Sequence, residues 1–309
     1  MRARDEVLHS DEERVEANGI EIVYDTFGDP GDPPILLIMG LGAQMIAWHD
    51  DFCARLAGRG TYVIRYDNRD VGLSTKMSGI PNLLEMVQAW LGGELPEAQE
   101  LPYTITAMAA DAAGLLDALS ITPAHVAGVS MGGMIAQHLA LDYPQHVRSL
   151  TLISTTSGNF DLPRPETDAL SALMAPPAPD REGRIAQAVE TNRLFSGDLP
   201  FDADEAWEDA ARAHDRSFYP EGMVRQMAAS LAVPWYEALP QLDVPTLVIH
   251  GERDPFFPLA HGEDLAETIP GARLHVVEGG GHNFPRPAWP ELIAAVVQHV
   301  KAVERGASS

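Results

Sequence analysis

The chain has 309 residues, of which 45% are hydrophobic and 21% charged, values typical of a packed globular protein. Its formal net charge of −24 disfavours binding to nucleic-acid phosphates or to an anionic lipid surface. The first residues lack the apolar segment of a secretory signal, and the single cysteine, Cys53, excludes an internal disulfide. We therefore expect a cytoplasmic protein that binds neither nucleic acid nor membranes. We expect the thiol of Cys53 to be buried and inert.

Strand and helix patterns alternate along the first half of the chain. Residues 21–28 alternate in polarity and predict an early edge strand, followed by a turn. Apolar runs at 35–40, 61–67, 124–129 and 147–154 are typical of strands buried on both faces, with helical patterns between them. This rhythm predicts a mostly parallel, doubly wound sheet with helices on both faces.

The rhythm changes between residues 157 and 242, where proline-rich connectors separate three helical patterns. So long a strandless insertion is too helical to be a loop. We predict that 157–242 forms a helical cap, inserted between the sixth and seventh strands of a core made of 1–156 and 243–309. Strand patterns resume at 245–251 and 272–279, and a last helix closes the domain.

A serine flanked by glycines follows the strand pattern at 124–129. The sequence GVSMG at 128–132 matches G-x-S-x-G between a strand and a helix, the context that this motif requires. A sharp turn there holds Ser130 in a crowded backbone conformation, so residues two positions away must lack bulky side chains. The turn projects the hydroxyl from the end of the sheet, beside a helix N-terminus. Ser130 is therefore the predicted nucleophile.

A serine hydroxyl needs a base to accept its proton, and His282 is the candidate among eleven histidines. It follows EGGG after the last strand pattern, where glycines let a loop bring the imidazole over the sheet edge. Asp254, just beyond the strand pattern at 245–251, is predicted to orient this imidazole, with Glu252 as the alternative. The chain order serine, aspartate, histidine is that of one fold.

Five segments resemble the α/β-hydrolase superfamily, and the resemblance extends from about residue 21 to residue 303. They are most similar to bacterial esterases related to aclacinomycin methylesterase, which removes a methyl ester from a polyketide antibiotic. The segments are LLIMGLGAQMIAW, VIRYDNRDVGLST, HVAGVSMGGMIAQ, VPTLVIHGERDP and GGGHNFP. The resemblance implies the α/β-hydrolase fold and a serine esterase that needs no cofactor.

The same resemblance implies an oxyanion hole made of two backbone N–H groups. One belongs to Met131, directly after the predicted nucleophile, and the other to Leu41 in the segment MGLGA, with Gly42 as the alternative. Met39 stands where many relatives have a histidine, while Gly40 still permits the turn. Donors of this kind lower a reaction barrier by about 3 kcal/mol each.

Large apolar side chains are frequent in the predicted cap. Most should pack its helices on the sheet, but a lid rich in methionine and aromatic residues suits a bulky apolar ester. We expect a hydrophobic ester or lactone as the small-molecule partner, with polyketide and macrolide rings among the candidates. The predicted substrate contacts are Gly40, Gly42, Phe195, Trp207 and Tyr219.

Other interpretations of the sequence have less support. The segment GLGAQM mimics a dinucleotide fingerprint, but Met45 occupies its third small position. No HExxH motif or clustered His and Cys spacing indicates a metal, so we expect neither cofactor nor metal. Asp67, Arg69 and Asp70 are expected to brace a turn. A perhydrolase or haloperoxidase-like enzyme, a carbon–carbon bond hydrolase and a non-catalytic small-molecule receptor stay open, as does the oligomeric state.

Overall fold

The computed structural model of the protein describes residues 7–92 and 101–307. Within these residues the centre is an eight-stranded sheet in the order β1-β2-β4-β3-β5-β6-β7-β8, antiparallel at β1 and β2 and parallel elsewhere. The predicted mostly parallel sheet is confirmed. Its strands are β1 (Glu13–Ala17), β2 (Ile20–Phe27), β3 (Pro34–Ile38), β4 (Tyr62–Tyr66), β5 (Ala124–Val129), β6 (Val147–Ile153), β7 (Thr246–Gly251) and β8 (Arg273–Val277).

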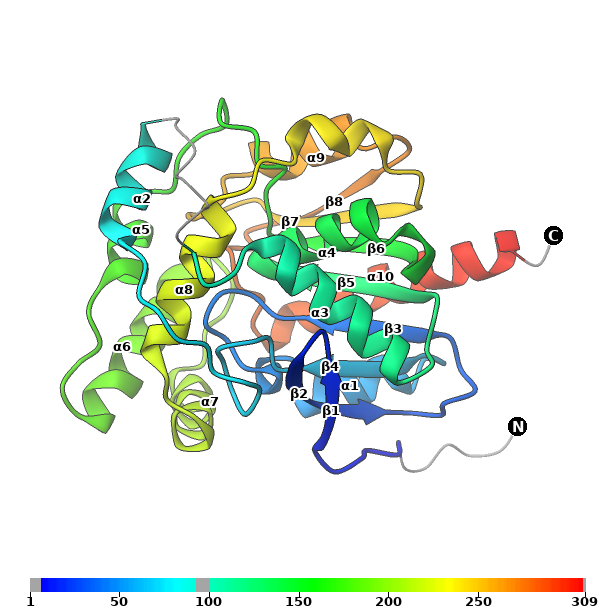
Figure 1. Ribbon diagram of the computed structural model, residues 1–309, viewed down its shortest axis with the longest axis horizontal. Helices are drawn as coiled ribbons and strands as arrows, with labels where there is room; N and C mark the ends of the chain where they lie inside the picture. The colour runs from blue at the N-terminus through cyan, green and yellow to red at the C-terminus, as the bar shows by residue number, and fades with distance from the viewer. Residues whose placement is uncertain (1–6, 93–100, 308–309) are drawn as a thin grey trace.

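Helices cover both faces of the sheet (Figure 1). One layer contains α3 (Ile105–Ala118), α4 (Met131–Asp142) and α9 (Ala260–Thr268), and the other contains α1 (Asp50–Ala57) and α10 (Trp289–Ala307). Short 3-10 helices span Met45–Ala47, Pro144–His146, Tyr236–Gln241 and Arg286–Ala288. Among residues 7–92 and 101–307, none of the helices combines the length and the apolar character that a membrane crossing needs.

Apolar side chains dominate the central strands because each of their faces meets a helix layer. In β3, Leu36 and Ile38 pack with the layer of α3 and α4, whereas Ile35 and Leu37 pack with the layer of α1 and α10. Successive side chains of a strand point to opposite faces, so a strand between two layers needs a continuous apolar run. This is why the sequence displayed β3 to β7 so clearly.

The sequence-based prediction of the edge strand is wrong. β2 lies inside the sheet, because β1 pairs with its outer side, from Glu13 opposite Tyr24 to Ala17 opposite Ile20. β1 reads ERVEA and exposes most of its charged side chains. Such a composition is typical of edge strands, but it gives little apolar periodicity that a sequence pattern could detect.

Four helices lie between β6 and β7 and occupy the left side of Figure 1. The insertion of helices at this point of the chain agrees with the predicted fold class, whereas the division into two domains stays a prediction. α2 (Leu83–Leu91), which the sequence did not reveal, packs against the last of the four through Met86 and Ala228. The four are α5 (Thr167–Met174), α6 (Arg181–Phe195), α7 (Ala203–Arg216) and α8 (Pro220–Leu231).

The segment after β4 fastens these helices to the sheet. Asp70 accepts two hydrogen bonds from Arg225 of α8, at 2.9 and 3.0 Å, and Asp67 pairs with Arg216 of α7 at 2.8 Å. Arg69 forms a buried ion pair with a carboxylate of α3. Asp67 and Asp70 also accept the backbone N–H groups of Leu73 and Met77, at 2.8 and 2.7 Å, so these two carboxylates brace the turn as expected and anchor the inserted helices. Arg69 instead joins the segment to α3.

The single cysteine lies in the layer of α1 and α10. Cys53 is fully buried, and burial raises the pKa of its thiol to about 12. The predicted burial of Cys53 is therefore confirmed, and a thiol with a raised pKa is expected to be unreactive at neutral pH.

Candidate active site

Ser130 stands at the tight turn between β5 and α4. Its φ of 54° is a value that non-glycine residues seldom adopt, and the Ile153 carbonyl accepts its backbone N–H. The neighbouring glycines are sterically required. A Cβ at Gly128 would lie 2.1 Å from the Gly132 carbonyl oxygen, and a Cβ at Gly132 would lie 2.2 Å from that of Ile38. The sharp strand-to-helix turn that GVSMG predicted is therefore present.

The imidazole of His282 joins Ser130 to Asp254. Its Nε2 lies 3.0 Å from Ser130 Oγ, and its Nδ1 lies 2.8 Å from Asp254 Oδ2. The three residues follow β5, β7 and β8, parallel strands whose carboxyl ends share one edge of the sheet. The structure thus brings together all three residues that the sequence proposed as nucleophile, base and orienting acid.

Asp254 and not Glu252 contacts the imidazole. Asp254 is buried, and its Oδ1 accepts the backbone N–H groups of Phe256 and Phe257, both at 2.8 Å, which leaves Oδ2 for His282. Glu252 instead accepts the N–H of a glycine after β8, at 3.0 Å. One carboxylate therefore orients the histidine, and the other braces a turn.

Three aromatic rings surround His282, which is only 5% exposed. The ring centroids of Phe195, Phe256 and Phe257 lie 5.4, 5.4 and 5.7 Å from that of the imidazole. The Asn283 N–H also donates to the Phe195 carbonyl at 2.8 Å, which ties the histidine loop to the end of α6. No sequence pattern pointed to Phe256 and Phe257, although they directly follow Asp-Pro in DPFF.

The loop after β3 passes beside the nucleophile. A Cβ at Gly40 would lie 3.2 Å from the Cβ of Ser130. The Gly42 N–H donates to the side chain of Gln226 in α8 at 2.8 Å, so this donor is already engaged. Within the described part of the chain, the N–H groups of Leu41 and Met131 have no acceptor. Of the two alternatives that the sequence left open, the geometry favours Leu41, and no sequence signal pointed to Gln226.

Two cavities adjoin at this loop. The apolar cavity has a volume of about 90 Å³ and is lined by Ser130, Met131 and Leu41, together with apolar side chains from α2, α8 and the segment before α5. The large cavity has a volume of about 670 Å³ and is lined by His282 and Leu41, together with residues of α6, α7 and α8. Leu41 borders both cavities.

Comparison with known proteins places the chain in a family. Residues 33–285 match the family model described as the alpha/beta hydrolase fold. The chain belongs to the α/β-hydrolase family. It is 34% identical over 297 residues to rhodomycin D methylesterase DauP of Streptomyces sp. (strain C5), covering 89% of this chain and 93% of that relative. Rhodomycin D methylesterase DnrP of Streptomyces peucetius is 34% identical over 298 residues, with the same two coverages. The predicted resemblance to methylesterase-like hydrolases is confirmed.

Solved structures of the family show the same fold. The meta-cleavage product hydrolase CumD from Pseudomonas fluorescens IP01 superposes with a TM-score of 0.71 at 24% identity, covering 94% of this chain and 97% of that chain. At this identity the likeness concerns the fold alone. The α/β-hydrolase fold that the sequence predicted is thus confirmed by two independent comparisons.

Only some of the predicted substrate contacts of this α/β hydrolase line a cavity. Gly42 and Tyr219 line the large cavity, whereas Gly40 packs against Ser130. The ring of Phe195 packs against His282 and borders neither cavity. The side chain of Trp207 is 40% exposed and also borders neither cavity, so the contacts predicted for these two residues gain no support and stay predictions. α7 faces the large cavity with Ala206, Asp209, Ala210 and Ala213, and a single residue step rotates Trp207 by about 100° from Ala206.

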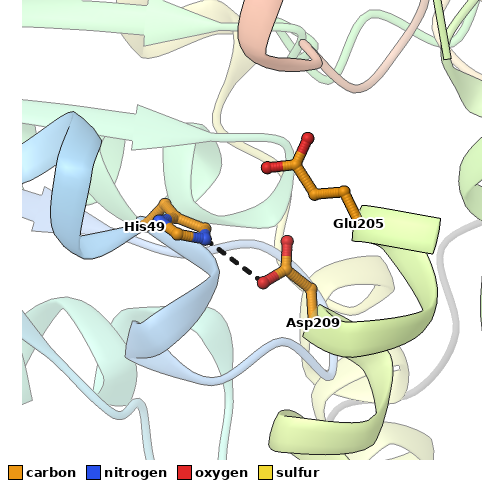
Figure 2. A group of neighbouring side chains, drawn as sticks. All are labelled: His49, Glu205 and Asp209. Carbon is orange, nitrogen blue, oxygen red and sulfur yellow. Dashed lines mark hydrogen bonds and ion pairs between the residues drawn. The ribbon is translucent and has the colours of Figure 1, made fainter. Parts of the chain in front are cut away.

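Three potential metal ligands meet beside the large cavity. Figure 2 shows His49, just ahead of α1, facing Glu205 and Asp209 of α7, with His49 Nε2 3.2 Å from Asp209 Oδ1. Arg286 contacts both His49 and Glu205, and an Arg212 nitrogen lies 3.7 Å from the Asp209 carboxylate. The guanidinium groups already balance the two carboxylates, so this cluster is an ion-pair network that joins α7 to the core.

Proposed function

We propose that this α/β hydrolase is a carboxylic-ester hydrolase that acts through an acyl-enzyme on Ser130. The observation that carries the proposal is the hydrogen-bonded chain from Ser130 through His282 to the buried Asp254. An imidazole in this position can activate a hydroxyl that is otherwise a poor nucleophile. The similarity to two rhodomycin D methylesterases over most of the chain supports ester hydrolysis in particular.

The first half-reaction transfers the acyl group to Ser130. His282 Nε2 accepts the hydroxyl proton as Ser130 Oγ bonds to the ester carbonyl carbon, and the carbonyl electron pair moves to oxygen. The N–H groups of Leu41 and Met131 donate to this oxyanion. As the intermediate collapses, the bond to the alcohol oxygen breaks, and the leaving alkoxide takes the proton from His282.

The second half-reaction returns the free enzyme. A water molecule gives a proton to His282 as its oxygen attacks the acyl carbon, and the bond to Ser130 Oγ then breaks while Oγ recovers a proton from His282. Asp254 holds the imidazole in the required tautomer and stabilises the imidazolium in both halves. One ester and one water give one acid and one alcohol, so this chemistry requires no cofactor.

The proposed substrate is a bulky hydrophobic ester or lactone. The large cavity, at about 670 Å³, lies within the usual range of small-molecule sites. Aromatic and methionine side chains of the proposed cap, residues 157–242, line it, among them Phe218, Tyr219 and Met223. Polyketide and macrolide esters are therefore the first natural-product classes to test.

Turnover and covalent labelling test the proposal. Wild type should hydrolyse p-nitrophenyl esters, and Ser130→Ala should lose at least about a thousandfold in turnover. A fluorophosphonate probe should label wild type but neither Ser130→Ala nor His282→Ala, with circular dichroism confirming that the variants fold. Retained turnover in Ser130→Ala would place the chemistry elsewhere, and an unlabelled wild type would favour a non-catalytic receptor.

Substrate size tests the second part of the proposal. Acetate esters of bulky apolar alcohols should give higher kcat/KM values than acetate esters of short alcohols, because the alcohol portion, on the side of the large cavity, then displaces water from more apolar surface. A clear preference for short acetate esters would contradict the proposed substrate class without affecting the proposed reaction.

A further inference from the structure

One charged side chain lies in the wall of the apolar cavity. Binding of an apolar group does not explain why a charge is there. Among the described residues that line this cavity, Arg164 is the only Asp, Glu, Lys or Arg. Arg164 lies in the segment between β6 and α5 and is half-buried. Its guanidinium carbon lies 5.0 Å from the ring centroid of Trp90 and 5.8 Å from that of Phe160. The two rings hold the cation at the wall of the cavity.

Arg164 has no ion pair and no side-chain hydrogen bond within residues 7–92 and 101–307. This is unusual in a chain with 45 acidic and 21 basic side chains. The arginines beside the large cavity differ in this respect. Arg212 and Arg286 pair with carboxylates, and Arg184 donates to two backbone carbonyls. Arg164 alone among these four keeps its donors available.

The reaction geometry assigns the two cavities to the two halves of an ester. The leaving alkoxide takes its proton from His282, which lines the large cavity, so the alcohol portion lies on that side. Ser130 and Met131 line the apolar cavity, so the acyl substituent enters there. A volume of about 90 Å³ is smaller than the roughly 150 Å³ of a cavity that encloses benzene, so the apolar cavity suits a small substituent such as a short chain.

We propose that Arg164 binds an anionic oxygen group, a carboxylate or a phenolate, on the acyl portion of the substrate. This inference rests on the proposed function and names a specificity determinant for it. A guanidinium presents a planar fork of donors that matches a carboxylate, and a half-buried charge that has no counter-ion among the described residues gains from one. The apolar walls would select the hydrocarbon part, and Arg164 would select the charged end. The competing interpretation is that Arg164 only stacks between the rings and fixes their loop.

Matched pairs of esters test the proposal. The substrates are 4-nitrophenyl half esters of linear dicarboxylic acids, from succinic to suberic acid, and the same esters with the free carboxylate replaced by a carboxamide. For the best chain length, wild type should prefer the carboxylate ester by about tenfold or more in kcat/KM. Arg164→Met, which retains apolar contact with the rings, should bring this ratio to about one. Arg164→Lys should recover part of it.

A control variant removes an equal charge elsewhere. Arg193→Gln loses an exposed arginine that stacks over Phe201 at 4.6 Å and borders neither cavity, and it should keep the wild-type ratio. A ratio near one in wild type, or a preference that survives in Arg164→Met, would overturn the proposal. A preference confined to carboxylates on the alcohol portion would overturn it as well.

A binding measurement separates this inference from the proposed function. Calorimetry with Ser130→Ala, which needs no turnover, should show tighter binding of the free dicarboxylate than of its half amide, and the difference should disappear in Ser130→Ala/Arg164→Met. If wild type hydrolyses neither ester, the proposed function fails, while the calorimetry still decides the role of Arg164. If both esters are hydrolysed at equal rates, only the inference about Arg164 fails.

Discussion

The side chain of Gln226 in α8 accepts the backbone N–H of Gly42 at 2.8 Å and donates to the Arg69 carbonyl at 2.7 Å. A fully buried residue of α8 thus fixes the loop that carries the proposed oxyanion donor, Leu41. Because the loop and α8 lie 184 residues apart in sequence, the position of this donor depends on how the inserted helices dock on the sheet.

Replacing Gln226 should therefore impair the chemical step more than substrate binding. In Gln226→Leu we expect kcat to fall about ten- to a hundredfold with a smaller change in KM, because the donor is no longer held in place. Unpaired backbone groups should also lower the free energy of unfolding by about 1–3 kcal/mol. Steady-state kinetics and urea unfolding measure both effects. The exposed Gln145→Leu is the control, and equal kinetic losses in the two variants would refute the role of Gln226.

Two acidic residues at the end of β7 should respond very differently to neutralisation. Asp254→Asn should lower kcat by about a thousandfold or more, because an amide can no longer hold the His282 tautomer. Glu252→Gln should stay within about threefold of wild type, because Glu252 only braces a turn and an amide oxygen can still accept its N–H. The kinetics of both variants on one p-nitrophenyl ester decide the assignment, and similar losses would contradict it.

The turn around Ser130 should not tolerate a methyl group. Gly132→Ala places a Cβ 2.2 Å from a backbone oxygen, so something must shift, and we expect the free energy of unfolding to fall by about 3 kcal/mol or more. Among the described residues a Cβ at Gly306 would meet nothing within 4 Å, and Gly306→Ala should be close to neutral. Thermal unfolding compares the two variants. A Gly132→Ala protein with wild-type stability and turnover would show that the turn is less confined than its geometry indicates.

The ion pair between Asp70 and Arg225 should matter for stability. Asp70→Asn keeps a residue that accepts the φ of 72° at this position but leaves a buried guanidinium without its counter-ion. We expect the free energy of unfolding to fall by about 3–5 kcal/mol. The double variant Asp70→Asn/Arg225→Met should lose less than the single variant, since it removes the uncompensated charge. Additive losses in urea unfolding would argue against a coupled pair.

Buried histidines should make the protein sensitive to mild acid. Burial lowers the pKa of His138 from 6.5 to about 4, although the Asp142 carboxylate lies 3.9 Å away. Between these values the unfolded chain binds a proton that the folded chain does not, so the free energy of unfolding falls as the pH falls below about 6.5. At pH 5, His138 alone lowers the free energy of unfolding by about 2 kcal/mol.

Removing His138 should therefore flatten this pH dependence. Between pH 7 and pH 5, the free energy of unfolding of His138→Leu should fall by about 2 kcal/mol less than that of wild type, as measured by urea unfolding. His275→Leu, which replaces a partly exposed histidine that pairs with Glu291, is the control and should keep the wild-type dependence. An unchanged slope in His138→Leu would show that other groups dominate the acid response.

Local chemistry made most of the sheet and the site readable from the sequence. Buried parallel strands must be apolar on both faces, and a nucleophile at a tight turn needs small neighbours, so both leave short-range patterns around Ser130. Loops that follow successive parallel strands end at one edge, which is why Asp254 and His282 could be placed with it. The polar edge strand β1 left no such pattern, and α2, which packs on α8 and not on the sheet, was not predicted.

Only the tertiary structure decided which donor the oxyanion loop offers and where the inserted helices point their side chains. Gln226 occupies the Gly42 N–H from a helix that is remote in sequence, and Trp207 turns away from a cavity that its aromatic character suggested it would line. Such outcomes depend on the docking angle of one helix on another, which is set by the sum of many packing contacts. No local pattern of residues encodes that sum.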